Sequence, residues 1–298
     1  MGIKSKSKSR KIFQIFNYTF ICLLMFLCLF PLLHILALSF SNSAYTDANL
    51  VNFLPKGFTL AAYRYVMANA KFWHSFAITF ERLLVGIPLN LLLTILAAYP
   101  LSKTEHAFRG RKIYMWVFMF VMIFNAGLVP TYLLVKDLGL MDSIWALTLP
   151  MGVNVFNIVL MMNFFRGIPH EIEESALVDG AKQTTILMRL YLPLAKPSIA
   201  TITLFSFMGH WNSWMDGRIY MNNIENYPLQ TYLQNVIQAS DQVVMSSMNL
   251  KSVIDQMAVS GQNLRAAQLF ISMIPLLLVY PFLQKYFTTG LVMGSVKG

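Results

Sequence analysis

Long apolar runs separated by short polar connections dominate the pattern of this chain. A helix needs about 20 predominantly apolar residues to cross a lipid bilayer, and six runs approach or exceed that length. The runs are continuous and rich in Leu, Phe and Met, whereas the strands of a membrane barrel are short and alternating. The pattern therefore predicts an all-α polytopic membrane protein with spans at about residues 13–40, 76–101, 113–135, 144–165, 197–215 and 266–287.

Composition supports this prediction and argues against several other classes of protein. Hydrophobic residues make up 56% of the 298 residues and charged residues 12%, whereas a soluble domain is about 45–50% apolar and about 25% charged. A soluble enzyme, a disordered tail and a secreted disulfide scaffold are therefore disfavoured. Cys22 and Cys28 lie in the first apolar run and are expected to be inert, and the five histidines show no metal-ligand spacing, so no metal site is expected.

The distribution of basic residues predicts the orientation of the spans. With the N-terminus inside, the expected inside segments together with Lys285 at the inner end of the last span carry 15 Lys and Arg residues, and the outside segments carry 7. Because cytoplasmic segments are enriched in Lys and Arg, both termini are expected in the cytoplasm. The net charge of +10 is then a signal of topology rather than the footprint of a nucleic-acid site.

The N-terminal segment permits two interpretations. A basic tail at residues 1–12 precedes the first apolar run, as it does in a signal peptide. The apolar region of a signal peptide is about 7–15 residues long, and this run is roughly twice that length. We therefore expect a retained anchor helix and one transmembrane domain over residues 13–298, although Ala37-Leu38-Ser39 mimics a cleavage site.

Charged residues and prolines within the expected spans are candidates for function. Glu81 and Arg82 fall near the outer end of the second span, where charge is costly and often functional. Adjacent residues on a helix need not pair, so a structural or interfacial role and a role in a translocation path are both open. Kinked helices suit a protein that lines a path, although proline is common in membrane helices generally. The prolines concerned are Pro31, Pro88, Pro130, Pro275 and Pro281.

The inside segment 166–196 is unlike the other connections of the chain. Its length permits two short helices. Pro169 suits a helix start, and the glutamates that follow are favourable there because of the helix dipole. Ile172 and Ala176 can share an apolar face, and Gly180 permits a sharp turn. A second apolar stripe follows at Ile186, Leu187 and Leu190.

The spacing within this segment resembles the EAA loop of ABC importer permeases. That loop reads E-A-A, three residues, G, nine residues, then I-x-L-P, and its positions are taken here by Glu174-Ser175-Ala176, Gly180, Leu190 and Leu192-Pro193. Ser175 replaces the first Ala and Leu190 replaces Ile, with side chains of the same size class. Further residues are similar to the carbohydrate-uptake branch, and above all to its maltose-type second permease: Pro169, Glu173, Asp179-Gly180-Ala181, Asn125, Pro130, Leu138-Gly139-Leu140 and Gly294 to Gly298.

The resemblance implies the type I ABC importer permease fold, working by alternating access in the plasma membrane of a bacterium. The partners it implies are a homologous second permease, two ATPase subunits, an extracytoplasmic solute-binding protein and the lipid bilayer, with no nucleic acid. Segment 166–196 would then dock on the ATPase as a coupling helix. The implied coupling residues are Glu173, Glu174, Ser175, Ala176, Asp179, Gly180, Ala181, Leu192 and Pro193.

The chain carries no recognisable ATPase motif of its own. A phosphate-binding P-loop requires a Gly-Lys pair, and the sequence has none. We therefore expect no catalytic residue and no cofactor bound by this chain, with ATP and Mg held by the partner ATPase. A membrane-embedded enzyme would need clustered His, Asp or Glu, and the acidic cluster at 171–179 fits docking better. A channel, the remaining alternative, would transport without ATP.

The resemblance implies an oligosaccharide or a related glycan as the solute, with a peptide or a glycerophosphodiester as the alternative. Polar and aromatic residues in or near spans are candidates for the substrate path, namely Asn125, Asn154, Trp211, Asn212 and Trp214. Trp is also enriched at membrane interfaces for amphipathic reasons alone, and in maltose-type systems this subunit need not contact the substrate. The outside segment 216–265 is rich in amides and Tyr, which suit contact with sugars or with the binding protein, or an ordinary polar loop.

Overall fold

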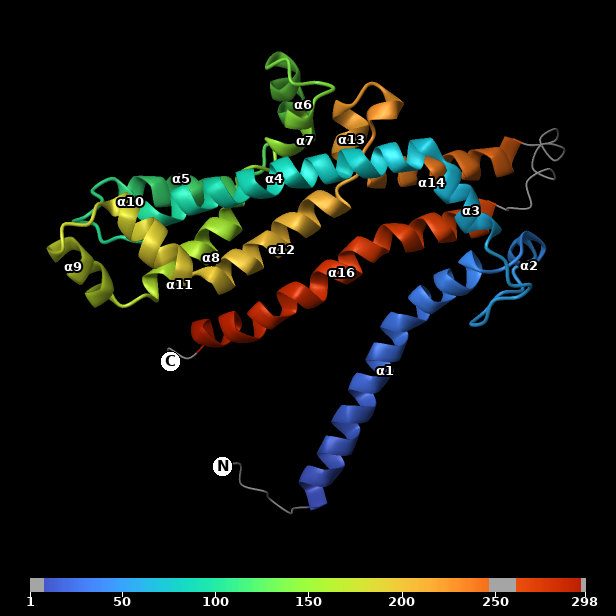
Figure 1. Ribbon diagram of the computed structural model, residues 1–298, viewed down its shortest axis with the longest axis horizontal. Helices are drawn as coiled ribbons and strands as arrows, with labels where there is room; N and C mark the ends of the chain where they lie inside the picture. The colour runs from blue at the N-terminus through green and yellow to red at the C-terminus, as the bar shows by residue number, and fades with distance from the viewer. Residues whose placement is uncertain (1–7, 247–260, 296–298) are drawn as a thin grey trace. The chain divides into compact units, whose positions relative to one another are not determined.

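The computed structural model describes the backbone of residues 8–246 and 261–295 and, within these ranges, the side chains of residues 10–237, 261–279 and 281. The regular structure in this part of the chain is helical, without strands (Figure 1). The described residues form two compact units, one within residues 1–69 and 236–273 and the other within residues 70–235 and 274–298. The all-α class expected from the apolar pattern is confirmed.

Three helices of the described ranges are long and apolar enough to cross a bilayer. They are α1 (Lys8–Ser39), α4 (Ala70–Ser102) and the first part of α16 (Gly261–Ser295). The number rises to five if each of two bent helix pairs is one span. The three helices coincide with the first, second and last expected spans, while the total of six spans and the cytoplasmic termini stay predictions.

The first unit combines α1 with two short helices, α2 (Ser43–Asp47) and α3 (Ala61–Ala68), and with the start of α16. The side chains of residues 10–33 are exposed and mostly apolar, as expected for a helix that faces lipid. The hydroxyl groups of Ser39 and Tyr63 lie 2.8 Å apart. This contact joins the C-terminal end of α1 to α3.

The second unit is built along α4. Two helices, α8 (Val155–Arg166) and α12 (Lys196–Asn212), pack against it, and Figure 1 shows the three side by side. Ala98, Met161 and Ile202 are among the buried apolar side chains that these helices contribute to one core. The same core includes apolar side chains of segment 166–196, so this segment is part of the folded unit.

The third expected span is broken rather than continuous. α5 (Arg111–Ile123) ends before Asn125, and α6 (Leu128–Asp137) leaves at an angle of 115°. Gly127 between them has a φ of 86°, a backbone conformation that glycine adopts without steric cost. Pro130 lies in the first turn of α6, where the missing N–H is tolerated. The change of direction therefore depends on Gly127.

The fourth expected span is also divided. The short helix α7 (Ile144–Thr148) and α8 are separated by the irregular residues 149–154. Backbone carbonyls freed by a break in an apolar region must find other donors. The side chain of Asn90 on α4 donates hydrogen bonds to the carbonyls of Met151 and Gly152 at 2.6 and 2.9 Å. The break is therefore stabilised by α4.

Close packing of α4 on α12 requires a glycine at position 86. A Cβ atom at Gly86 would lie 2.5 Å from Nε2 of His210, whereas one at Gly209 would meet Cε of Met151 at 3.4 Å, an ordinary contact. We expect Gly86→Ala to lower the free energy of unfolding by about 1–3 kcal/mol and Gly209→Ala to cause no loss. Thermal unfolding of the detergent-purified protein measures both, and equal melting temperatures for the two variants would contradict the close contact.

Candidate coupling loop and buried polar contacts

The segment between α8 and α12 folds into the two short helices expected from its sequence. The first, α9 (His170–Val178), begins at Pro169 and carries two glutamates in its first turn, where the helix dipole favours carboxylates. Gly180 then turns the chain with a φ of 77°. The second helical stretch starts with α10 (Gln183–Ile186). The expected helix start, turn and second helix are confirmed.

A π-helical turn lies in the second helical stretch. This turn, η1 (Leu187–Tyr191), follows α10 directly and leads into α11 (Leu192–Leu194). The backbone N–H of Leu192 donates to the carbonyl of Leu187, five residues earlier. Pro193 has no N–H to donate, so the wider turn accommodates it. The stretch then meets α12 at an angle of 80°, and the bend lies at Ala195, two residues after Pro193.

One face of each loop helix packs on the core of the second unit. Ile172 and Ala176 of α9 contact the core, and Ile186 and Leu187 are buried in it. Leu190 packs there as well, and both apolar stripes expected from the sequence are confirmed. Burial of apolar surface contributes about 25 cal/mol per Å², so the segment is held to the helices rather than being a free connection.

Glu173 faces the interior of the protein. Its exposure is 8%, and its carboxylate accepts hydrogen bonds from the Lys103 amine and the Tyr191 hydroxyl, both at 2.7 Å. Burial raises the pKa of this carboxyl, but these hydrogen bonds and the charge of Lys103 outweigh it and hold the pKa below its ordinary value. Glu173 is therefore an ionised anchor of α9, and its carboxylate is used within this chain.

Lys103, the residue directly after α4, completes this anchor. Its amine lies 4.0 Å from the ring centre of Tyr99 and 4.2 Å from that of Tyr191, a cation–π geometry. Burial lowers the pKa of the amine, and the Glu173 carboxylate opposes that shift. The EAA spacing does not identify Lys103, because it precedes Glu173 by 70 residues. Its signal in the sequence is a lysine placed directly after an apolar run.

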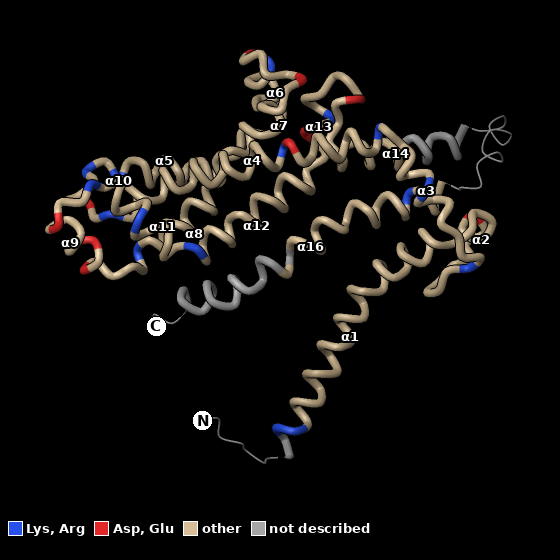
Figure 2. The backbone as a smooth tube through the Cα atoms, viewed as in Figure 1, with Lys and Arg blue, Asp and Glu red and all other residues tan. Residues whose placement is uncertain are grey.

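The other face of α9 is open to solvent. Glu174, Ser175 and Asp179 are exposed, and Val178 is 87% exposed. Of the other expected coupling residues, Gly180 and Pro193 are exposed, and Ala176, Ala181 and Leu192 are partly buried. Figure 2 shows the acidic residues of α9 close to basic residues of the neighbouring segments. The two adjacent glutamates therefore lie on different sides of the helix. Glu173 faces the interior of the protein, and Glu174 lies on the surface.

A second polar cluster lies among the apolar helices of this unit. Arg82 is fully buried, and its guanidinium forms an ion pair with Asp216 in α13 (Met215–Tyr220). Nε of Arg82 also donates to Nδ1 of His210 at 3.3 Å, and Nε2 of His210 lies 2.9 Å from Oδ1 of Asn90. A buried charge is costly unless it is paired. The cluster provides that pairing and joins α4 to α12 and α13.

The structure separates the roles of Glu81 and Arg82. Glu81 is exposed, whereas Arg82 contacts Asp216, which is 134 residues away. Arg82 therefore stabilises the packing of α4, which is the structural alternative considered from the sequence. Neither His210 nor Asp216 stands out in the sequence. The polar amide of Asn90 inside an apolar run is the one further feature of the sequence that points to a buried polar cluster here.

The five residues expected along a substrate path do not form one site. Asn154 caps α8 by accepting a hydrogen bond from the backbone N–H of Asn157 at 3.2 Å. Trp211 is 2% exposed and packs against three phenylalanine rings. Asn212 is exposed and Trp214 is partly buried. Asn125 is the one among the five that lines a cavity of about 530 Å³, between α6, α7 and α13.

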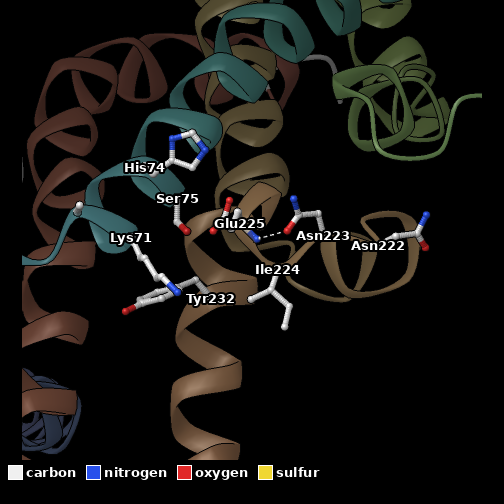
Figure 3. A pocket seen from close by; sticks show the side chains of 9 residues that line it. Lys71, His74, Ser75, Asn222, Asn223, Ile224, Glu225 and Tyr232 are labelled. Atoms are coloured by element: carbon white, nitrogen blue, oxygen red, sulfur yellow. Dashed lines mark hydrogen bonds between the residues drawn. The ribbon is translucent and has the colours of Figure 1, made fainter.

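A larger cavity, of about 780 Å³, lies between the N-terminal end of α4 and the turn that precedes α14 (Leu229–Ser246) (Figure 3). We call it the outer polar cavity. Part of the amide-rich segment 216–265, which is expected to lie outside, contributes to it. Residues of α4 that the sequence analysis did not single out complete the lining. Its polar lining consists of Lys71, His74, Ser75, Asn222, Asn223, Glu225 and Tyr232.

Comparison with known proteins finds similar chains over nearly the whole length. The chain is 38% identical over 292 residues to the protein LplC of Bacillus subtilis (strain 168), with 98% of this chain and 97% of LplC covered. It is 36% identical over 290 residues to the polygalacturonan/rhamnogalacturonan transport system permease protein YtcP of the same bacterium, with 97% and 99% covered. No family model matches the chain.

A solved structure is similar in fold as well as in sequence. It is the crystal structure of a bacterial ABC transporter involved in the import of the acidic polysaccharide alginate. One of its chains is 34% identical to this one and superposes with a TM-score of 0.86, over 95% of this chain and 99% of that chain. The resemblance first seen in the EAA spacing is confirmed, and this chain belongs to the permease subunits of ABC importers, in the branch that takes up carbohydrates.

Proposed function

We propose that this chain is one of two permease subunits of a glycan importer in the plasma membrane of a bacterium, driven by a separate ATPase that binds ATP and Mg. The observation that carries the proposal is the two-sided arrangement of α9. Its inner face is anchored by Glu173, and its outer face presents Glu174 and Val178 to solvent. A helix fixed on one side and open on the other is suited to dock on a partner subunit and to transmit force.

In this proposal, α9 passes movement of the ATPase to the membrane helices. Lys103, directly after α4, donates a hydrogen bond to Glu173. The second helical stretch is buried in the core that α4, α8 and α12 share. A displacement of α9 would therefore displace the cytoplasmic ends of α4 and α12. Closure of the ATPase would draw the two coupling helices together and open the path to the outside, where the binding protein delivers solute, and hydrolysis would reset it.

The proposed topology follows the apolar runs and the distribution of basic residues. It has six spans, both termini in the cytoplasm, segment 166–196 on the ATPase side and segment 216–265 outside. The two bent helix pairs suit this topology if each pair forms one crossing.

The solute in this proposal is an oligosaccharide or a related glycan. YtcP is named for polygalacturonan and rhamnogalacturonan, and the solved relative is involved in the import of alginate. Polysaccharides therefore recur among the similar proteins. A peptide or a glycerophosphodiester is the alternative, and the coupling loop is compatible with each because it would contact the ATPase rather than the solute.

Copurification from the native membrane tests the assembly and the solute together. We expect the tagged chain, solubilised in a mild detergent, to retain a second permease and an ATPase. The associated binding protein should carry an oligosaccharide identifiable by mass spectrometry. A bound peptide or glycerophosphodiester would overturn the glycan assignment, and transport without ATP or an ATPase partner would indicate a channel.

Charge reversal on the open face of α9 tests the docking role. Glu174→Lys changes an exposed carboxylate and leaves the Glu173 anchor intact. Because charge reversal at a contact both removes attraction and adds repulsion, we expect ATP-driven uptake to fall at least about tenfold and less ATPase to copurify. Glu105→Lys is the matched control, since Glu105 is also exposed in an expected cytoplasmic segment but lies outside α9. Normal assembly and uptake with Glu174→Lys would refute docking through this face.

Removal of the cation at position 103 tests the anchor itself. Lys103→Met leaves the carboxylate of Glu173 buried without its counter-charge, which costs about 3–5 kcal/mol when such a pair is broken. The double variant Lys103→Met/Glu173→Gln removes both charges and should recover part of that loss. Denaturant unfolding of the purified protein measures the difference. If the single and double variants are equally stable, the ion pair does not anchor the loop.

The pH dependence of stability gives an independent check on the same anchor. The pKa of Glu173 is held below its ordinary value in the folded chain. Its contribution is therefore fully present above the ordinary glutamate pKa and is lost as the pH falls through the lower folded value. Glu173→Gln should flatten this part of the pH profile when denaturant unfolding is followed at a series of pH values.

A further inference from the structure

The outer polar cavity is built from side chains that the coupling mechanism does not use. Figure 3 shows Lys71, His74 and Ser75 of α4 on one side and the turn of residues 222–225 on the other, with Tyr232 from α14 beside Lys71. Seven of the nine lining residues are polar. The volume of about 780 Å³ lies in the range of about 300–1,000 Å³ that is typical of small-molecule sites.

The wall formed by residues 222–225 is fixed in position from outside the cavity. The carboxylate of Asp142 accepts hydrogen bonds from the backbone N–H and the side-chain Nδ2 of Asn222, both at 2.6 Å. The backbone N–H of Asp142 in turn donates to the carbonyl of Tyr220 at 3.0 Å. Oδ1 of Asn223 accepts from the backbone N–H of Glu225 at 2.9 Å, as Figure 3 shows. These bonds orient both amides before any ligand binds, which lowers the entropic cost of binding.

The remaining polar atoms of this wall match the hydroxyl groups of a sugar. Asn222 uses its amide nitrogen on Asp142, which leaves its oxygen as an acceptor. Asn223 uses its oxygen on Glu225, which leaves its nitrogen as a donor. The carboxylate of Glu225 has two oxygens and can accept hydrogen bonds from two donors at once. Planar amide and carboxylate groups can bind pairs of neighbouring hydroxyls, which both donate and accept.

The rest of the lining favours a sugar over a phosphate-bearing solute. Ala70 and Ile224 are its two apolar residues, and the other seven lining residues carry polar groups. A phosphate group would approach Lys71 and His74 but would also meet the carboxylate of Glu225. The ring of Tyr232 packs edge-to-face against that of Phe72, so Tyr232 completes this side of the lining.

We propose that the outer polar cavity binds a sugar unit of the transported glycan, and that this permease subunit therefore contacts its solute directly. The inference rests on the proposed function. The cavity is formed by segments that the basic residues assign to the outside, so a solute released by the binding protein would reach it first. A polar loop of the binding protein is the competing occupant, and the test separates the two.

The test is equilibrium binding of two neutral probes, maltotriose and galactotriose, to the complete permease–ATPase complex in nanodiscs without its binding protein. We expect the wild-type complex to bind at least one probe. Glu225→Gln should weaken that binding about tenfold or more, the loss expected for a charge-assisted hydrogen bond. Glu81→Gln is the matched control, because Glu81 is an exposed glutamate of α4 that does not line the cavity. Basal ATP hydrolysis should be the same in the wild-type and Glu81→Gln complexes.

Each other outcome overturns the inference. Binding of neither probe, or equal affinity in wild type and Glu225→Gln, would remove the sugar site. Unchanged probe affinity with weaker association of the binding protein would assign the cavity to that protein. In both cases ATP-driven uptake by the wild-type transporter would leave the proposed function standing. The proposed function fails separately, if the native binding protein carries a peptide or glycerophosphodiester.

Discussion

A charged or polar group placed among apolar helices is stable only where the chain supplies its partner, and α4, with the lysine directly after it, meets this constraint at three places in the second unit. Its side chains pair with groups of three other segments. Asn90 donates to the carbonyls of the break between α7 and α8, and Arg82 pairs with Asp216 of α13. Lys103, directly after α4, holds Glu173 of α9. Because each of these contacts is made by α4 or by the residue directly after it, the irregular segments keep defined positions around one helix.

This arrangement has a consequence for coupling. The loop helix α9 combines apolar contacts through Ile172 and Ala176 with the ion pair of Glu173, and both hold it against the membrane helices. Its exposed face keeps Glu174 and Val178. A connection that was only a polar loop would absorb a displacement by bending. In the proposed function an anchored helix would transmit it, which is what a permease driven from a separate ATPase would require.

Residue patterns that depend on local physics could be read directly from the sequence. The start of α9 at Pro169, the turn at Gly180 and the apolar stripes of both loop helices follow from backbone preferences and helical spacing, and the structure has all of them. The spans near α1, α4 and α16 follow from the length of their apolar runs. The third and fourth runs are equally apolar but are divided, at Gly127 and at residues 149–154. Hydropathy measures transfer into lipid and contains no term for the direction of the backbone.

The sequence by itself determined the all-α class, the apolar runs and the EAA spacing, because these depend on composition and on contacts a few residues apart. The tertiary structure alone decided which polar groups meet. Glu173 and Glu174 are adjacent and chemically identical, yet one is an internal anchor and the other is exposed, because Lys103 and Tyr191 approach α9 from one side only. Arg82 finds Asp216 across 134 residues, and Asn222 is oriented by Asp142 across 80. Such pairings arise from the packing of distant segments, where the cost of an unpaired buried group selects the partner, and no local pattern records them.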